Sequence, residues 1–432
     1  MAERRGYITR QAKRLTNGEI NRRRFVMSAL SAGVTLPTAM SLAAKAESRV
    51  PKRGGTLRIA MNHPAPIRSG QMLSDLDALV ALGTGNALTE ITTDGTVRGE
   101  LAEHVDAVDS HRIWQLELRD DVFFADGAPL TAQDIVATLD GHPLLAPSVV
   151  SLTVDGPRGV RFELHAADRY FAHRLADPRL VIRSAHDDGR HLTGAYRLEG
   201  ADKKGVLQMV RRDGYWKPGC AHFDAIRLTP MADVTARQHA VMAGDVDYAD
   251  GIDPRACELL RRTPGIKVME SDIGRRIDLQ LEQADAAGLA ALEALEDHLP
   301  RQAILDQLLL GHGTIGPRRQ FGTTDAALPD RPFEVAIQDT GVPSLKETAQ
   351  IVTHHLAERG MHLHVTNDGH AADFALVWRT VQSWERGSAR QATTLVTANE
   401  LSACRSNLAH PDRLATHAAH DGGRLLERWW FA

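Results

Sequence analysis

Residues 114–136 read WQLELRDDVFFADGAPLTAQDIV, and this stretch contains three elements in immediate succession. The alternation of apolar and polar residues over Trp114–Leu118 is typical of a half-buried β-strand. The Asp126-Gly127 pair predicts a turn, because glycine accepts the left-handed backbone that such a turn needs. Thr131, with Asp134 three residues later, predicts the N-cap of a helix of about ten residues. The stretch therefore predicts a strand, a turn and a capped helix.

Further elements are predicted on both sides of this unit. Alternating or short apolar runs predict strands at 56–61, 88–90, 160–164, 193–198, 206–210, 223–228, 333–337, 362–365 and 374–378. Helices are predicted at 233–243, within 284–310 and at 345–356, the last of them after a capping box at 344–347. The order strand, helix, strand, strand in the last third implies an α/β lobe with a partly parallel sheet.

The N-terminus has the pattern of an export signal. Residues 21–27 read NRRRFVM, and the apolar stretch that follows is interrupted by polar residues and by Pro37, so it is too polar for a good membrane span. Ala44-Lys45-Ala46 has the small-x-small form of a signal-peptidase site. Residues 1–46 are therefore predicted to be a twin-arginine signal peptide that directs the chain to the periplasm of a Gram-negative bacterium. The alternative is an amphipathic N-terminal helix of a cytosolic protein.

The charge balance bears on the class of partner. The chain has 432 residues, enough for two or three domains, with 51 Lys+Arg and 55 Asp+Glu. Residues 1–46 hold nine of the basic and two of the acidic residues, so the remainder carries 42 basic and 53 acidic side chains. An acidic chain of this kind does not favour nucleic acid, which is bound largely through phosphate contacts.

The residues that usually carry chemistry are sparse. Cys220, Cys257 and Cys404 allow at most one disulfide and have no CxxC spacing, so each is expected to be a small buried apolar side chain. No GxSxG, HExxH or Walker A motif occurs in a suitable context. The acid pair Asp245/Asp247 is expected on the solvated surface. The sequence thus predicts neither an enzyme nor a bound cofactor.

Several segments, in this order along the chain, are similar to a known family. Besides residues 114–136 they are Gly99–Glu103, Thr193–Tyr196, Asp213–Trp216, Phe223–Ile226 and Val241–Asp247. Together they resemble the large solute-binding proteins of ABC transporters, the peptide/nickel/oligopeptide-binding group known as family 5. The resemblance is strong over 53–250 and patchy over 251–378.

The resemblance implies an α/β fold of the type II periplasmic binding protein kind, with two lobes around a cleft and an extra small domain. It places the first lobe at 53–87 with 191–250, the small domain at 88–190, and a shortened second lobe with a C-terminal segment at 251–432. It also implies a monomeric solute-binding component of an ABC importer. Such a protein captures a peptide-like or other small anionic or zwitterionic solute and delivers it to membrane permease subunits.

The candidate ligand-binding residues are Trp378, Arg379, Trp384 and Glu385. Peptide binders of the family have an acidic residue after the strand that ends at Trp378, whereas this chain continues RTVQSWE. Glu385 could replace that acid, and the Arg379 guanidinium suits a carboxylate or phosphate. The two tryptophans offer faces for stacking. The plainer alternatives are that Arg379 pairs with a surface acid and that the tryptophans, with Trp429 and Trp430, belong to the core.

Histidine is abundant and leaves a second function open. All 20 histidines follow residue 46. The groups of interest are His354-His355, His362/His364, His370 and His410/His417/His420. His417 and His420 stand three residues apart and could share a helix face. Because imidazole binds nickel, copper and zinc, a metal or nickel-chelate binding protein is the alternative function; incidental surface histidines are the plainer interpretation. No metal ligand is assigned.

Overall fold

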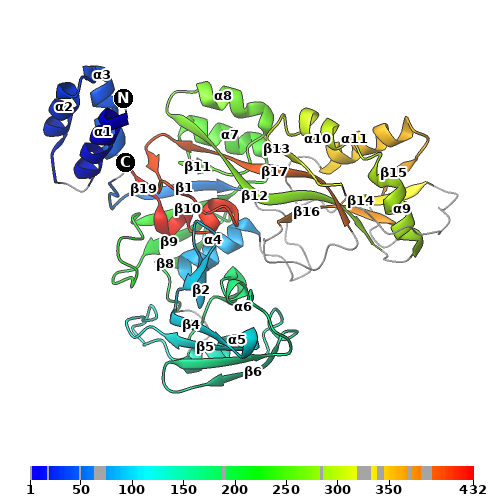
Figure 1. The fold of residues 1–432 in the computed structure, drawn as a ribbon, viewed down its shortest axis with the longest axis horizontal. Coiled ribbons are helices and arrows are strands. Elements are labelled where there is room, and N and C mark those ends of the chain that lie inside the picture. The colour runs from blue at the N-terminus through cyan, green and yellow to red at the C-terminus, as the bar shows by residue number, and fades with distance from the viewer. Residues whose placement is uncertain are drawn as a thin grey trace.

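The computed structural model describes residues 2–16, 19–47, 50–62, 74–186, 191–282, 286–318, 332–337, 345–366, 372–380 and 392–432. Within them one mixed sheet of eleven strands runs through the molecule in the order β15-β14-β16-β12-β17-β11-β1-β10-β9-β8, with β13 beside β17 (Figure 1). Its strands are β1 (Thr56–Met61), β8 (Tyr196–Ala201), β9 (Leu207–Arg211), β10 (Ala225–Pro230), β11 (Tyr248–Ala249), β12 (Ile266–Leu281), β13 (Gly313–Ile315), β14 (Phe333–Ile337), β15 (Leu363–Thr366), β16 (Phe374–Thr380) and β17 (Ala392–Arg405).

Strands β12 and β17 join the two halves of this sheet. They pair antiparallel from Ile266↔Arg405 to Gln280↔Ala392. At one end β17 pairs with β11, and at the other β12 pairs with β16. The two strands cross the molecule side by side in Figure 1. Each half of the protein therefore contains part of the same two strands.

Each half has its own hydrophobic core. On one side α4 (Asp75–Thr84) packs on β1, β8, β9 and β10, and α7 (Val234–Ala243) and α8 (Cys257–Arg262) cover β11 and the near end of β12. On the other side α9 (Ala286–Glu296), α10 (Arg301–Gln307) and α11 (Leu345–Ala357) pack on β12, β14 and β16. The predicted helices at 233–243 and 345–356 are confirmed, and the helical stretch 284–310 is divided into two by a turn at Pro300.

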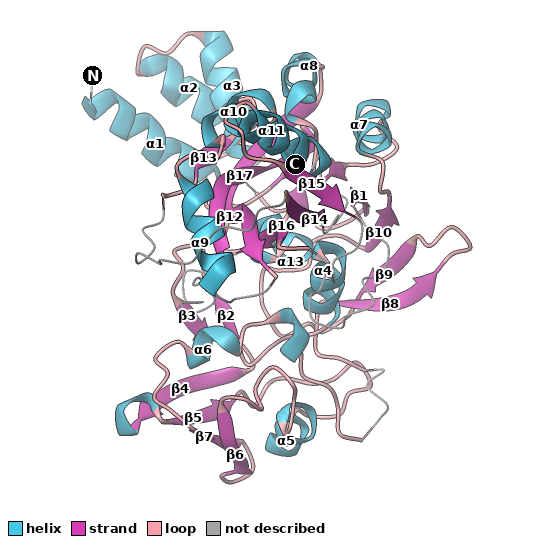
Figure 2. Cartoon of the chain, turned by 90° about the vertical axis from the view of Figure 1, so that its right-hand side faces the viewer, coloured by secondary structure: helices cyan, strands magenta, loops and turns pink. Residues whose placement is uncertain are grey.

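A separate sheet forms the small domain. Strands β4 (Ala102–Val108), β5 (Ile113–Leu118), β7 (Gly159–Leu164) and β6 (Val149–Val154) are neighbours in that order, with α5 (Ala132–Leu139) and α6 (Phe171–Arg174) beside them and the hairpin β2 (Thr89–Ile91)–β3 (Val97–Gly99) above (Figure 2). The predicted capping box is present, since Thr131 donates from its N–H and its hydroxyl to Asp134 at 2.8 and 2.7 Å. Gly127 has the expected positive φ of 89°.

The C-terminal segment returns to the first half and closes its core. It contains β18 (Leu408–Ala409), α12 (Ala419–Gly422), α13 (Leu425–Arg428) and β19 (Trp430–Phe431). Trp429 is 1% exposed and packs in the same cluster as Leu57 and Leu228. The core interpretation of Trp429 and Trp430 is thus confirmed.

A buried network of charges fixes this segment to the start of the small domain. Lys217 lies 2.6 to 3.0 Å from carboxylate oxygens of Glu90, Glu100 and Glu427. Arg424 contacts Glu100 at 2.6 Å and Glu427 at 3.2 Å. Burial by itself would raise the pKa of Glu90, but Lys217 and Arg424 lower that pKa to about 2.

The N-terminal residues form three helices of their own, α1 (Ala2–Thr16), α2 (Arg22–Ser31) and α3 (Leu36–Glu47), drawn in dark blue in Figure 1. Their shared core includes Leu15, Phe25 and Ala43, with no contribution from other described parts of the chain. Among the described residues no helix is both long and apolar enough to span a bilayer.

Two expectations differ from the structure. Of the pair Asp245/Asp247, only Asp245 is exposed. Asp247 is buried, and its carboxylate accepts from the Arg58 side chain at 2.8 and 3.0 Å and from the Arg58 N–H at 3.0 Å. His417 and His420 share no helix face, since α12 begins after His417 and His420 has a left-handed backbone with φ 54°.

The three thiols are free. Cys257 and Cys404 are buried as expected, whereas Cys220 is half-buried.

Candidate functional site

A small pocket opens where the two halves meet. It is bounded by Trp378 of β16, Arg275 of β12 and Glu400 of β17, by the loop 251–255 after β11, and by Leu308 and Leu309 after α10. Residues from both sides of the molecule therefore line it. Its volume of about 60 Å³ corresponds to roughly two water molecules, which is room for one small chemical group.

The register of the sheet brings the three side chains to one face. Ile277 lies opposite Trp378, and Arg275 lies opposite Ala398. Alternate residues of a strand share a face, which places Arg275 with Trp378 and, through Ala398, with Glu400.

Trp378 contributes an unused hydrogen-bond donor. Its side chain is 8% exposed and packs in the core of the second half. Within the described part of the chain its indole Nε1 has no acceptor. A buried donor without a partner is unfavourable by about 1–3 kcal/mol, so an acceptor on a ligand at this position would be stabilised.

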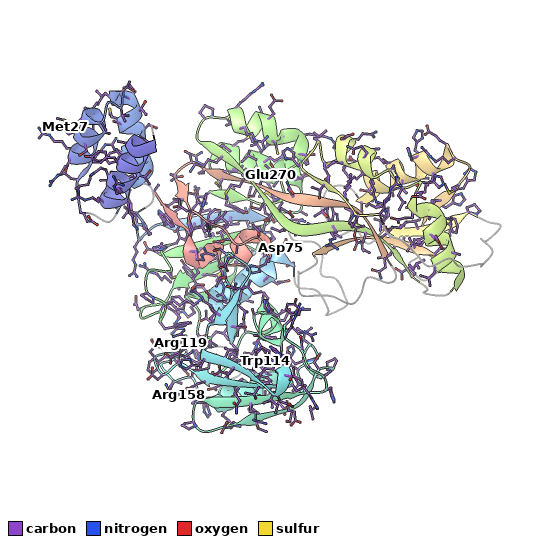
Figure 3. All side chains as sticks on the ribbon, in the orientation of Figure 1. Met27, Asp75, Trp114, Arg119, Arg158 and Glu270 are labelled. Carbon is purple, nitrogen blue, oxygen red and sulfur yellow. The ribbon has the colours of Figure 1, made fainter. Side chains whose placement is uncertain are left out.

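The charged residues of the pocket are coupled across the junction. The Arg275 guanidinium donates to Asp75, the first residue of α4, at 2.5 Å; Figure 3 labels Asp75 between the two halves. Burial would raise the pKa of Asp75, but Arg275 and His420 together outweigh it and hold that pKa below its usual value. Burial raises the pKa of Glu400, against the opposing effect of His420 and Arg275. The negative charge of Glu400 is thus less well compensated than that of Asp75.

His420 connects the pocket to the C-terminal segment. Its Nδ1 lies 3.0 Å from the Tyr248 hydroxyl and 3.6 Å from Glu400, and its Nε2 lies 4.0 Å from Asp250. Asp250 is itself held by the Asn62 N–H at 2.7 Å and by Arg237 at 3.3 Å. These contacts hold the Glu400 side chain against the C-terminal segment.

The predicted ligand-binding residues are only partly described. Trp378 lines the pocket. Arg379 follows in β16 with its backbone opposite Arg276, and Trp384 and Glu385 lie outside the described residues. Whether these four residues bind a ligand stays a prediction.

Arg275 and Glu400 were missed by sequence reasoning. Glu400 is the only charged residue between Ala392 and Cys404. A lone carboxylate in an otherwise uncharged strand is the signal that could have identified it. Arg275 has a weaker signal, since Arg276 adjoins it and β12 is charged along much of its length.

The histidines form no recognisable metal centre in the ranges that the structure describes, where no group of three or more His, Cys, Asp or Glu side chains has a suitable geometry. His354 and His364 instead lie near acids, at 3.5 Å from Glu358 and 3.6 Å from Glu334. His370 lies outside the described residues.

Comparison with known proteins gives a consistent result. Residues 96–318 match the profile of the bacterial extracellular solute-binding proteins, family 5, middle region, which is about half of the chain. The glutathione-binding protein GsiB of Salmonella typhi is 26% identical over 259 residues, covering 55% of this chain and 51% of that protein. A GsiB of Escherichia coli O157:H7 is 24% identical over the same length. The chain thus spans about half the length of these relatives.

Solved structures resemble it over a larger share. The binding protein AgaA from A. tumefaciens R10, in complex with agropinic acid, has a TM-score of 0.71 at 16% identity and covers 88% of this chain and 99% of its own. NikZ from Campylobacter jejuni, in complex with Ni(L-His), has a TM-score of 0.71 at 13% identity, with coverages of 87% and 99%. The oligopeptide-binding protein AppA from Bacillus subtilis, in complex with a nonapeptide, gives 0.70 at 14% identity, with coverages of 88% and 100%. These likenesses confirm the predicted fold, a type II periplasmic binding protein.

Proposed function

Because the chain belongs to the bacterial extracellular solute-binding proteins of family 5, we propose that it is the solute-capturing component of an ABC importer. In this role it binds a small solute in the periplasm and delivers it to membrane permease subunits. The observation that carries the proposal is the pocket at the junction, which is lined by Trp378 from β16 and by Glu400 from β17.

The ligand we propose is a small zwitterionic or anionic solute, such as a short peptide or a modified amino acid. An ammonium group would meet the carboxylate of Glu400, which lines the pocket. A carboxylate of the ligand would either accept from the Trp378 indole or pair with Arg379, the next residue of β16, since neighbouring residues of a strand face opposite sides. Trp384 and Glu385, which follow shortly after, complete the proposed set. The family class, a solute-binding protein rather than an enzyme, supports binding without turnover.

We propose the domain division 53–87 with 191–250, 88–190, and 251–432, with the last residues of the third part returning to the first. The separate cores support it, since one cluster draws on residues 88–182 and another on 277–398. Closure of the two lobes over the ligand would be a hinge motion, with β12 and β17 as the crossing strands.

The direct test is to denature the protein as purified and to identify by mass spectrometry what it releases. Release of a small zwitterion or anion, followed by saturable rebinding and a more compact shape in solution, is the expected result. Release of nickel with an organic chelate would favour the alternative function, which the likeness to the nickel-binding NikZ supports. Reproducible conversion of the released compound by pure protein would contradict the binding-protein proposal.

Once the ligand is known, Glu400→Gln should weaken its binding about ten- to a hundredfold, because a charge-assisted bond is worth about 1.5–3 kcal/mol. Glu258→Gln is the control, because Glu258 is an exposed residue of α8 outside the pocket and pairs only with its helix neighbour Arg262 among the described residues. Equal affinities of the two variants would remove Glu400 from the site.

A further inference from the structure

The small domain contains a second cavity, separate from the junction pocket. It lies between β3, β4, β5 and α6, and its apolar wall is formed by Val97, Val105 and Ala172. Its volume is about 230 Å³. Cavities of about 150 Å³ are large enough to admit benzene, so this one has room for a six-membered ring with a substituent.

One of the residues that line the cavity, Trp114, carries a buried hydrogen-bond donor without an acceptor in the described chain. Trp114 of β5 is 6% exposed, and its ring is fixed by contacts with His111 and Phe171 at centroid distances of 5.9 Å. No acceptor for its indole Nε1 is found among the described residues. Indole N–H groups usually find a partner when they are buried, and an acceptor bound in the cavity would supply one.

The remaining polar side chains of the cavity are Arg98, Arg169 and His173, and no carboxylate lines it in the described chain. Glu90 neutralises Arg98. The nearby Asp168 pairs with Arg174 at 3.2 Å.

Arg169 has no carboxylate partner within the described ranges; its guanidinium lies 4.6 Å from the centre of the Tyr170 ring. Burial lowers the pKa of His173, so that imidazole adds no charge at neutral pH. The uncompensated charge at this cavity is therefore the positive charge of Arg169.

We propose that this cavity is a binding site for a small organic carboxylate with an aromatic or branched aliphatic body. The carboxylate would accept from the Trp114 indole and pair with Arg169, while the body of the ligand contacts Val97, Val105 and Ala172. Guanidinium and carboxylate groups match in geometry as well as in charge. The site is independent of solute transport through the junction pocket.

The test is a titration of the full-length protein with benzoate, and with benzamide as the neutral probe of the same shape, by calorimetry or ligand-observed NMR. Benzoate should bind saturably to one site, at least about tenfold more tightly than benzamide, because a hydrogen bond to a charged group is the stronger kind. Absence of saturable benzoate binding up to millimolar concentrations, or equal binding of both probes, would overturn the proposal.

Two variants locate the bound benzoate. Arg169→Gln should weaken benzoate binding by tenfold or more, and Trp114→Phe should weaken it while keeping the apolar ring. Arg158→Gln is the matched control, since Arg158 is another arginine of the small domain, lies outside the cavity and pairs with Glu117 at 2.9 Å (Figure 3). Arg169 is exposed, so its replacement tests the site even where Trp114→Phe fails to fold.

A last variant separates the two pockets. Trp378→Phe removes the indole donor of the junction pocket and should leave benzoate binding unchanged. Loss of benzoate binding in Trp378→Phe with no change in Arg169→Gln would place the carboxylate at the junction and contradict the proposal.

Discussion

Lys217 illustrates how a single buried residue holds distant parts of the sequence together. It contacts Glu90, Glu100 and Glu427, which come from the start of the small domain and from the C-terminal helix α13. Such a network is satisfied only as a whole, because each buried carboxylate depends on the cations beside it.

Lys217→Met should lower the stability of the protein by about 3–5 kcal/mol, because it leaves buried carboxylates without their counter-charge. The measurement is the melting temperature, with the exposed Lys203→Met as the control. Equal melting temperatures of the two variants would show that the network contributes little.

His417 gives the protein a pH-dependent stability. Burial, with Arg424 and Arg428, lowers the pKa of His417 to about 4. The unfolded chain, with a histidine pKa near ~6.5, therefore takes up a proton before the folded one does. The stability that His417 contributes is complete above the unfolded pKa and is lost as the pH falls from there towards the folded pKa of about 4. Asp421 acts in the opposite sense, since burial raises its pKa to about 6 and its contribution is lost as the pH rises through that value.

His417→Gln removes the first effect alone. Melting curves from pH 7 to 4 should show that the wild-type protein loses up to roughly 3 kcal/mol more than the variant over this range. Parallel curves for the two proteins would rule out His417 as the titrating group.

At the scale of elements, the N-terminus of α5 is held by the capping box of Thr131 and Asp134, which the sequence already predicts. Asp134 is buried and accepts from Thr131 and also from the Ala185 N–H at 2.7 Å. Thr131→Ala should therefore cost about 0.5–2 kcal/mol, as for other capping residues. Asp134→Ala should cost more, because it leaves two segments without their acceptor. Thermal unfolding measures both, with the exposed Gln133→Ala as control, and the reverse order would contradict this account.

Strands and helices that show a regular hydrophobic pattern over a short stretch could be predicted from the sequence, whereas strands without such a pattern could not. β1 and β14 were predicted to the residue, because each is a short apolar run between polar segments. The longest strands, β12 and β17, were missed. β12 carries charges at Lys267, Glu270 and Arg275. Its ends lie in different lobes, and helices cover only parts of the strand, so charged side chains are tolerated along the uncovered part. Periodicity detects a strand that is half-buried along its whole length, and β12 is not.

The same reason limits what could be predicted of the site. Trp378 was found through the resemblance to the family, but its neighbours Arg275 and Glu400 reach it only through the register of β12 and β17. Sequence gives no such register without the strands themselves.

At the scale of the whole molecule, the two arginines that begin α2 do not help to stabilise that helix. Arg22 and Arg23 are exposed on the first turn of α2, where a positive charge opposes the helix dipole. Their position there is consistent with the prediction that residues 1–46 are a twin-arginine signal.

The double variant Arg22→Lys/Arg23→Lys should stay in the cytoplasm with residues 1–46 still attached, because the twin-arginine pathway needs the arginine pair. Cell fractionation and the mass of the recovered protein measure this. Arg10→Lys/Arg14→Lys, elsewhere in the leader, is the control and should be processed normally. Normal processing of the first variant would mean that another route exports the protein.

The return of the C-terminal segment to the first lobe has a consequence for synthesis on the ribosome. The core around Leu57 is completed by Leu408, Leu425 and Trp429, which are translated more than 300 residues later. Domains usually fold as they emerge, N-terminal part first, but this lobe cannot close its core before residues 408–429 have been made. Contacts between such distant residues also slow folding. The nascent chain must therefore wait with part of its apolar surface uncovered, and we expect it to depend on a chaperone during that interval.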